Sequence, residues 1–369
     1  MYAALEAPGP TASSANPIKV MIVDDSAVLR GLVSRWIEEE PGLEVVARHA
    51  NGRLAVDDVA RSAPDIVLLD IEMPVMDGLE ALPLLLEARR ETRVLMVSTL
   101  TRRNAEISLK ALALGALDYV PKPDTNREIT TSLDFRREVI RKVKMLGRAA
   151  IHRPGTTERA ADEAFKPPPS FKWRPFSLVP PRVVAIGSST GGPEALSGLL
   201  GLAAPWLSCI PVVIAQHMPP VFTAILAERL ARATNREAKE GSEGEPLRPG
   251  TIYVAPGNRH MTVVSSARPA LRIGNEPPIH SCRPAVDPLF ASVAAIFRPA
   301  ALGVVLTGMG QDGATGAWAI AEAGGSVIAQ DEASSVVWGH ARGGRVSGRL
   351  RGDTATDQNR RGDGQTDQR

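Results

Sequence analysis

Acidic side chains follow two short apolar runs in the first part of the chain. Asp24 and Asp25 come directly after IKVMIV, and Asp70 comes directly after DIVLL. Three carboxylates held together repel one another, and a hard divalent cation such as Mg²⁺ relieves that repulsion through oxygen ligands. A carboxylate beside such a cation can attack a phosphoryl group as a nucleophile. These residues therefore predict a magnesium-dependent phosphoryl-transfer site.

A serine and a lysine follow two more apolar runs of the same kind. Ser98 ends RVLMVS, and Lys122 lies in the segment YVPKP. A lysine and a hydroxyl group are able to hold phosphoryl oxygens. Any one of these polar residues, taken singly, is more often a solvated strand end than a catalyst. Because parallel strands place their carboxyl ends at one edge of a sheet, we expect all of them to meet there.

A serine in a glycine-rich turn forms the second candidate centre. The run Gly187-Ser188-Ser189-Thr190-Gly191 fits the G-x-S-x-G pattern, in which a sharp strand-to-helix turn presents a serine at the sheet edge. Two phosphate-binding interpretations fail, because no lysine follows the glycines and the spacing is not GxGxxG. A helix N-cap serine is the alternative if the serine has no catalytic partners.

A histidine and an aspartate are the predicted partners of Ser189. His217 directly follows the strand-like run PVVIAQ, and Asp312 follows ALGVVLTG within LTGMGQDG. The three residues thus supply a nucleophile, a base and an orienting carboxylate from three strand ends. Their order along the chain differs from the Ser-Asp-His order of α/β-hydrolases, so that fold is not supported.

Three other titratable residues of the second half receive different interpretations. Asp287 stands at the start of an amphipathic helix and is interpreted as a helix-terminus residue. His260 and His280 lie in or near an inserted segment and are candidates to line the site.

Hydrophobic patterning predicts two α/β domains that position these residues. Over 18–146, five apolar strands alternate with helices, which indicates an N-terminal (βα)5 doubly wound parallel sheet. From Arg182, strands alternate with helices near 193–202, 219–233, 284–297 and 313–323, which indicates a second doubly wound parallel α/β domain over 182–339. Within it, residues 237–274 contain TIYVAPG, MTVVSS and LRIG, which we interpret as an antiparallel insertion.

Composition limits the class of protein, its partners and its cellular compartment. The 369 residues have 44% hydrophobic and 23% charged side chains with a net charge of +2, which excludes fibrous, disulfide-scaffold and wholly disordered proteins. The near-neutral balance argues against nucleic acid as a partner. No apolar run is long enough to span a bilayer and no signal peptide is evident, so we expect a cytoplasmic protein without membrane insertion. The proline-rich stretch 147–181 is predicted to be a linker.

The first domain resembles the receiver domain of two-component response regulators through VDDS, LLDIEMPVMDG, MVST and DYVPKP. The resemblance implies that Asp70 is the phosphoacceptor and that Asp24, Asp25 and Asp70 bind Mg²⁺. It further implies that Ser98 and Lys122 are switch residues and that a chemotaxis histidine kinase supplies the phosphoryl group.

The second domain resembles the catalytic domain of the chemotaxis protein-glutamate methylesterase (CheB) family through IGSSTGG, QHMPP, APGNRHM, RPAVD, LTGMGQDG and AQDEASSVVWG. The resemblance implies hydrolysis of glutamate methyl esters on chemoreceptor cytoplasmic domains and deamidation of receptor glutamines. Ser189 is then the nucleophile, His217 the base and Asp312 its orienter, with Thr190 and Met309 as oxyanion-hole residues. No cofactor is expected in the esterase domain, and the receiver is expected to cover or misorient its site until Asp70 is phosphorylated.

The sequence departs from the family pattern after VVWG. Residues 340–369 are rich in Arg, Gly and Asp and are expected to be disordered, where the family continues with a Met-Pro step and an amphipathic helix. This departure leaves one alternative function, a catalytically impaired regulator that binds receptors under receiver control.

Overall fold

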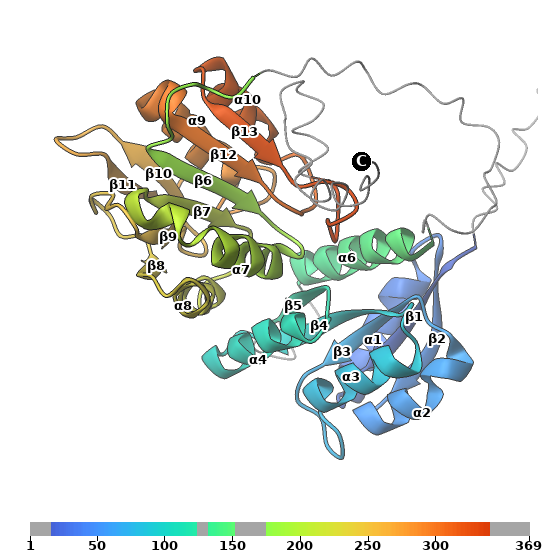
Figure 1. Cartoon of the computed structure of the whole chain (residues 1–369). Helices are drawn as coiled ribbons and strands as arrows, with labels where there is room; N and C mark the ends of the chain where they lie inside the picture. Colours follow the sequence, from blue (N-terminus) through green and yellow to red (C-terminus); the bar gives the residue numbers. More distant parts are fainter. Residues whose placement is uncertain (1–15, 124–131, 152–174, 340–369) are drawn as a thin grey trace, which may run out of the picture. The chain divides into compact units, whose positions relative to one another are not determined.

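The computed structural model describes residues 16–123, 132–151 and 175–339 (Figure 1). Its first sheet has the strand order β2-β1-β3-β4-β5, and the pairs β1–β2, β1–β3 and β3–β4 are parallel. The strands are β1 (Ile18–Val23), β2 (Leu43–His49), β3 (Ile66–Asp70), β4 (Arg93–Thr99) and β5 (Asp118–Lys122). Each predicted strand of this domain is therefore present, and the carboxyl ends of β1 and β3 are neighbours.

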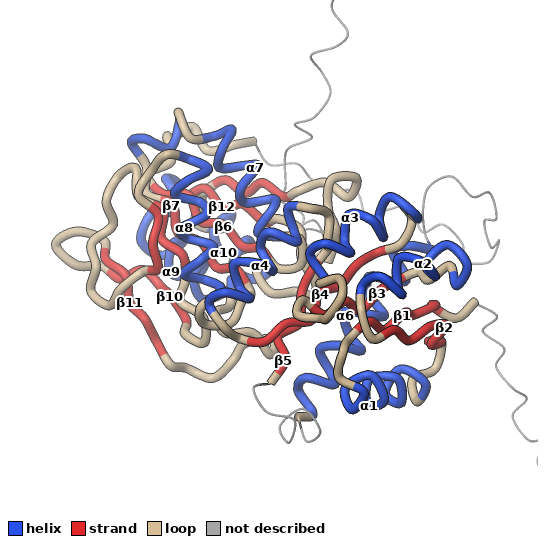
Figure 2. Tube along the Cα trace, turned by 90° about the horizontal axis from the view of Figure 1, so that it is seen from below, coloured by secondary structure: helices blue, strands red, loops and turns tan. Residues whose placement is uncertain are grey.

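Helices connect these strands and cover the sheet. They are α1 (Ala27–Glu38), α2 (Gly52–Ser62), α3 (Gly78–Ala88), α4 (Arg102–Ala113) and α6 (Leu133–Ile151). Figure 2 shows α1 and α6 on one face of β1–β3, with α2 and α3 on the other. The ring of Trp36 in α1 meets that of Phe135 in α6 edge-on, with centroids 5.8 Å apart. The helix α6 continues to Ile151, so its end lies within the stretch that we predicted as linker.

Polar caps fix where four of these helices begin. The side chains of Ser26, Asn51, Asp77 and Thr101 each accept a hydrogen bond from a backbone N–H in the first turn of the helix that follows. Asp77 also forms a capping box with Glu80, whose side chain accepts from the Asp77 backbone N–H. Such caps satisfy amides that lack an acceptor within the helix. They therefore set the loops at the strand ends, where the acidic residues lie.

The second sheet has six strands in the order β13-β12-β6-β7-β9-β8, and all of its pairings are parallel. The strands are β6 (Val183–Ser188), β7 (Val212–Gln216), β8 (Ala238–Glu240), β9 (Ile252–Val254), β12 (Ala301–Val305) and β13 (Ser326–Ala329). The hairpin β10 (His260–Val264) and β11 (Ala270–Gly274) is antiparallel and forms a separate two-stranded sheet.

The predicted antiparallel insertion is thus only partly correct. The segment TIYVAPG contains β9, which pairs in parallel with both β7 and β8 in the main sheet. The error has a physical reason. A fully buried strand of three residues has no alternation that distinguishes an insertion strand from a central one. The α8 helix that precedes β8 and β9 provides the crossover that a parallel pairing requires.

Helices cover both faces of the second sheet. They are α7 (Gly192–Ala203), α8 (Phe222–Thr234), α9 (Val286–Phe297) and α10 (Ala314–Glu322), with short 3-10 turns at Trp206–Cys209 and Arg298–Ala300. In Figure 1 α9 and α10 lie together on one face, and α7 and α8 lie on the other. Val183, Ala185 and Val213 point into one core with Phe290 of α9 and Ile320 of α10. Strand residues between them point to the opposite face, which α7 and α8 cover.

The chain forms two compact units. One contains β1 to β3, most of β4 and α6; the other contains Ser98–Lys122 and the described residues from 175 onward. No helix among the described residues is long and apolar enough to cross a membrane. The predicted disordered tail, 340–369, lies outside the described residues, as do 152–174 of the predicted linker.

Candidate functional site

Three carboxylates gather at the carboxyl ends of β1 and β3. Asp24, Asp25 and Asp70 each offer an oxygen, and these atoms all lie within 4.8 Å of one another. Asp24 and Asp70 are buried, whereas Asp25 is exposed. Oxygen ligands crowded in this way are what Mg²⁺ prefers, and a cation would offset their mutual repulsion. The residues present therefore fit the predicted cation.

Backbone geometry holds this acidic cluster in place. One oxygen of Asp24 accepts a hydrogen bond from the Ser26 N–H at 2.9 Å, and one of Asp70 accepts from the Ile71 N–H at 2.8 Å. Gly78, at the start of α3, packs on the backbone of Asp70, and a Cβ there would lie 2.0 Å from the Asp70 carbonyl oxygen. Only glycine lets the loop after β3 fold back so closely.

The predicted switch residues stand at the ends of the next two strands. Ser98 is buried in β4, and its hydroxyl is 3.0 Å from the hydroxyl of Ser108 in α4. Lys122 is the last residue of β5 and is also buried. Both residues occupy strand ends, as the sequence predicts. Their roles in switching stay predictions.

The register of the second sheet aligns the three proposed catalytic residues. Ser188 at the end of β6 pairs with Gln216 at the end of β7, so Ser189 and His217 each follow by one residue. The His217 N–H donates to the Ser188 carbonyl at 3.1 Å. On the other side of β6, the Ser189 N–H donates to the carbonyl of Thr307, which follows β12, at 3.0 Å. The turns after β6, β7 and β12 therefore meet.

The two adjacent serines have different surroundings. Ser188 is fully buried, and its hydroxyl donates to Gln216 Oε1 at 2.6 Å. Ser189 is partly exposed, and its hydroxyl forms no hydrogen bond within the described part of the chain. A hydroxyl that is already donated in the core is a poor nucleophile candidate. The geometry therefore favours Ser189, which occupies the central position of the G-x-S-x-G turn.

Gln216 joins the turns that carry the serine and the histidine. Its amide Nε2 donates to the Ser189 carbonyl at 2.9 Å, while its Oε1 accepts from Ser188. Gly192 allows this approach, because a Cβ there would lie 2.0 Å from Gln216 Oε1. Gln216 is not among the site residues predicted from the sequence. Its only signal is its position directly before His217 at a strand end.

His217 and Asp312 form the predicted base-carboxylate pair. His217 Nε2 lies 2.7 Å from Asp312 Oδ2, and their side chains are 10% and 2% exposed. Burial alone lowers the pKa of His217, but hydrogen bonds to Asp312 and to Cys282 and the charges of both groups outweigh it and raise that pKa to about 9. Burial alone raises the pKa of Asp312, but His217 and two backbone amides lower it to about 2.

Asp312 is fixed by backbone donors at the start of α9. Its Oδ2 accepts from the Val286 N–H at 2.6 Å, and its Oδ1 accepts from the Asp287 N–H at 3.0 Å. Asp287 Oδ1 in turn accepts from the Gly316 N–H of α10 at 2.7 Å. Asp287 is therefore at the helix start that the sequence predicted for it, and it lies beside the carboxylate of Asp312.

The predicted oxyanion-hole residues lie in two neighbouring turns. Thr190 directly follows Ser189, and its carbonyl accepts from Thr307 Oγ1 at 2.9 Å. Met309 lies between β12 and Asp312, in a turn whose Gly308 N–H donates to the Val337 carbonyl at 3.0 Å. The motif AQDEASSVVWG thus holds the turn that carries Met309. The oxyanion roles themselves stay predictions.

Two histidines and a cysteine complete the surroundings. His260 is buried, with Nε2 3.1 Å from the Pro277 carbonyl and Nδ1 accepting from the Ala285 N–H, so it packs structurally rather than lining the site. His280 is exposed and lies beside Asp287. Cys282 hydrogen-bonds to His217 and is not among the residues predicted from the sequence. Its approach depends on loop geometry that sequence periodicity does not encode.

The combination of sheets and sites defines a class of protein, a receiver domain joined to a hydrolase domain. The response regulator receiver domain family matches residues 20–134, and the CheB methylesterase family matches residues 184–345. A Rhodopseudomonas palustris protein named protein-glutamate methylesterase/protein-glutamine glutaminase of group 2 operon is 49% identical over 350 residues, covering 90% of each chain. A protein-glutamate methylesterase/protein-glutamine glutaminase 1 of Rhodospirillum rubrum is 49% identical over 342 residues, covering 88% of each chain.

A solved structure is similar to the second half of the chain. The CheB methylesterase catalytic domain of Thermotoga maritima has 36% sequence identity, covers 47% of this chain and 93% of that chain, and has a TM-score of 0.44. On the identity and coverage of the full-length relatives, this chain belongs to the CheB family of protein-glutamate methylesterases/protein-glutamine glutaminases.

Proposed function

We propose that this chain is a phosphorylation-controlled hydrolase that removes methyl groups from glutamate methyl esters on chemoreceptor cytoplasmic domains and deamidates receptor glutamines. The observation that supports this most strongly is the 2.7 Å pair of His217 and Asp312 beside the turn that carries Ser189. Neither the site nor the family membership favours the alternative, an impaired regulator that only binds receptors. Because its substrates are the cytoplasmic domains of receptors, we place the protein in the cytoplasm.

The reaction proceeds through an acyl-enzyme. Ser189 Oγ attacks the ester carbonyl carbon while His217 accepts the hydroxyl proton, and Asp312 stabilises the resulting imidazolium. When the tetrahedral intermediate collapses, the C–O bond breaks and His217 returns the proton to the departing methoxide, which leaves as methanol. Water then attacks the acyl carbonyl carbon while His217 accepts its proton. Collapse of this second intermediate returns the proton to Ser189 and releases glutamate. With a glutamine side chain the leaving group is ammonia.

Backbone N–H groups of the two turns stabilise the negative oxygen of the tetrahedral intermediate. We assign this role to the amide of Thr190 and to that of Met309, which lie in the turns after β6 and β12. Donors fixed in place before the reaction stabilise developing charge without reorganisation. The Ser189 amide is already donated to Thr307, so it is not a free donor for the oxyanion.

The receiver supplies the control. We assign Asp70 as the phosphoacceptor, with a chemotaxis histidine kinase as the phosphodonor, and Asp24, Asp25 and Asp70 as the residues that would hold Mg²⁺. The bound ion would neutralise charge between the carboxylates and the incoming phosphoryl oxygens. Ser98 and Lys122 then hold the phosphoryl group, and the phosphorylated receiver releases the hydrolase from inhibition.

We also propose the boundaries of the domains. Residues 18–146 are the receiver, 147–181 the linker, 182–339 the catalytic domain and 340–369 a divergent tail. The residues that carry the control and the chemistry fall inside the first and third of these ranges.

The nucleophile is tested by comparing Ser189→Ala with Ser188→Ala in the full-length protein. Ser189→Ala is expected to abolish methanol release from methylated receptor membranes while leaving receptor binding intact, because the hydroxyl supplies covalent chemistry. Ser188→Ala serves as the matched control and is expected to keep most of the activity, with a stability loss of about 1–3 kcal/mol for the unpaired Gln216 amide oxygen. Equal activities of the two variants would refute the assignment.

A further inference from the structure

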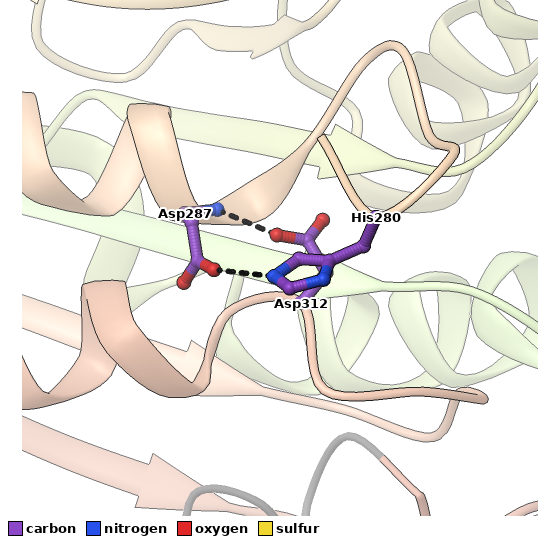
Figure 3. A group of neighbouring side chains, drawn as sticks. All are labelled: His280, Asp287 and Asp312. Atoms are coloured by element: carbon purple, nitrogen blue, oxygen red, sulfur yellow. Dashed lines mark hydrogen bonds and ion pairs between the residues drawn. The ribbon is translucent and has the colours of Figure 1, made fainter. Parts of the chain in front are cut away.

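A second cluster of metal-ligand residues shares Asp312 with the His217 pair. Figure 3 shows His280, Asp287 and Asp312 pointing toward one another. One imidazole nitrogen and one oxygen from each carboxylate lie within 4.8 Å of one another. His280 is exposed, Asp287 is partly buried and Asp312 is buried, so the cluster opens to solvent on the histidine side. The esterase mechanism uses only Asp312 of the three.

The separation of His280 and Asp287 fits an ion pair and also suits a shared metal. His280 Nε2 lies 3.5 Å from Asp287 Oδ2, which is long for a hydrogen bond between them. Ligands of a tetrahedral zinc ion, each about 2.1 Å from the metal, are separated from one another by about 3.4 Å. The two atoms therefore stand where two zinc ligands would stand.

The two carboxylates are oriented by backbone donors that leave lone pairs for a metal. Asp287 Oδ1 is occupied by the Gly316 N–H, which leaves Oδ2 facing His280. Asp312 Oδ2 accepts from both His217 and Val286, whereas the single donor to Oδ1 among the described residues is the Asp287 N–H, at 3.0 Å. A carboxylate oxygen has two acceptor sites, so Oδ1 retains one. Such supporting hydrogen bonds fix metal ligands before the metal arrives.

The turn that carries His280 is held rigidly. Ile279 and Cys282 exchange two backbone hydrogen bonds, of 3.0 and 2.8 Å, around His280 and Ser281, whose φ angles are +50° and +62°. Positive φ at both central residues is typical of a tight two-residue hairpin turn. Next to it, the Arg283 guanidinium donates to Asn258 Oδ1 at 2.6 Å and to neighbouring carbonyls. The imidazole is thus presented from a fixed loop.

The local charge favours a cation at this place. The carboxylates of Asp287 and Asp312 lie close together, and a cation between them would offset their mutual repulsion. One imidazole and two carboxylates suit a borderline divalent ion such as zinc. They suit Mg²⁺ and Ca²⁺ less well, because those ions prefer sites made of oxygen ligands alone.

We propose that His280, Asp287 and Asp312 form a Zn²⁺ site whose occupation inhibits the esterase. The ligands are His280 Nε2, Asp287 Oδ2 and Asp312 Oδ1, with water as the fourth. The inhibition rests on the proposed function, because it acts through Asp312. A dication on this carboxylate weakens its attraction for the His217 imidazolium, which forms when Ser189 is deprotonated. The site would thus make receptor demethylation sensitive to free zinc.

The test measures binding of ZnCl₂ alone to the metal-free full-length protein by calorimetry, with Mg²⁺ in excess to fill the receiver cluster. His280→Asn keeps a residue that tolerates positive φ, and Asp287→Asn keeps the acceptor for Gly316. Both variants are expected to bind zinc at least tenfold more weakly than the wild type. Cys282→Ser on the same turn and Asp25→Asn in the receiver are matched controls, expected to bind as the wild type does.

Unchanged zinc binding in His280→Asn, or loss of it in either control, would overturn the site. A second arm measures methanol release during the same titration, and half-inhibition is expected at the zinc concentration that half-fills the site. Zinc that binds without slowing methanol release overturns the inhibitory role. A metal-free protein that binds zinc through His280 but never releases methanol supports the site and refutes the proposed function.

Discussion

Replacing Asp312 by asparagine removes the charge that holds the proton on His217 and preserves the shape of the side chain. The pKa of His217 is about 9 against an ordinary 6.5, and this difference corresponds to roughly 3 kcal/mol in favour of the imidazolium. Cys282 contributes part of it, so we assign about 2–3 kcal/mol to Asp312. The imidazolium forms in the transition state, and Asp312→Asn is therefore expected to slow methanol release by roughly 30-fold to 150-fold above pH 9, where His217 is largely neutral in both proteins before the reaction.

Two assays check this prediction independently. NMR titration of the His217 ring in Asp312→Asn is expected to show its pKa falling toward 6.5, and methanol release from methylated receptor membranes is expected to fall by the factor above. Asp331→Asn is the matched control, because Asp331 also accepts a backbone hydrogen bond, from Ser334 at 2.8 Å, but lies outside the pair. A His217 pKa that stays near 9 in Asp312→Asn, or an unchanged rate above pH 9, would refute the reasoning.

Three further predictions concern the pH dependence of activity, the pH dependence of stability and the receiver. Because His217 must be neutral to act as a base, kcat/KM is expected to rise with pH and level off above about 9, whereas a profile that levels off near pH 6.5 would contradict the raised pKa. The same raised pKa contributes stability that is fully present below pH 6.5 and is lost as the pH rises through about 9, so denaturant unfolding of the catalytic domain should become easier over that interval. In the receiver, Gly78→Ala places a Cβ 2.0 Å from the Asp70 carbonyl and is expected to cost about 1–3 kcal/mol and to impair phosphorylation. Gly31→Ala in α1, where a Cβ meets nothing within 4 Å, is the control and should stabilise the protein by roughly 0.5–1 kcal/mol; equal melting temperatures would argue against the close approach at Gly78.

The strand ends were predictable because their signal is local. An apolar run followed by a polar residue identifies the end of a buried strand, and parallel topology then brings Asp24 to Asp70 and His217 to Asp312. The same reasoning located Ser189 through its glycine turn. These inferences need only the hydrophobic pattern and the rule that parallel strands share one ligand-binding edge.

Other features depend on contacts that the sequence pattern does not encode. The parallel pairing of β9 follows from where a three-residue strand docks, and its residues alone permit either direction. The amide of Gln216 and the thiol of Cys282 reach the site through turn geometry, which no periodicity describes. The placement of His280 beside Asp287 likewise depends on a turn with two positive φ angles, at a serine and a histidine rather than at glycines.

The central claim, that phosphorylation of Asp70 controls ester hydrolysis at Ser189, is tested most directly by one measurement. Methanol release from methylated receptor membranes is followed with and without a small phosphodonor and Mg²⁺, for the full-length wild type and for Asp70→Asn. The phosphodonor is expected to accelerate methanol release by the wild type and to leave Asp70→Asn at its basal rate. Equal acceleration of both proteins, or no acceleration of the wild type despite its phosphorylation, would contradict it.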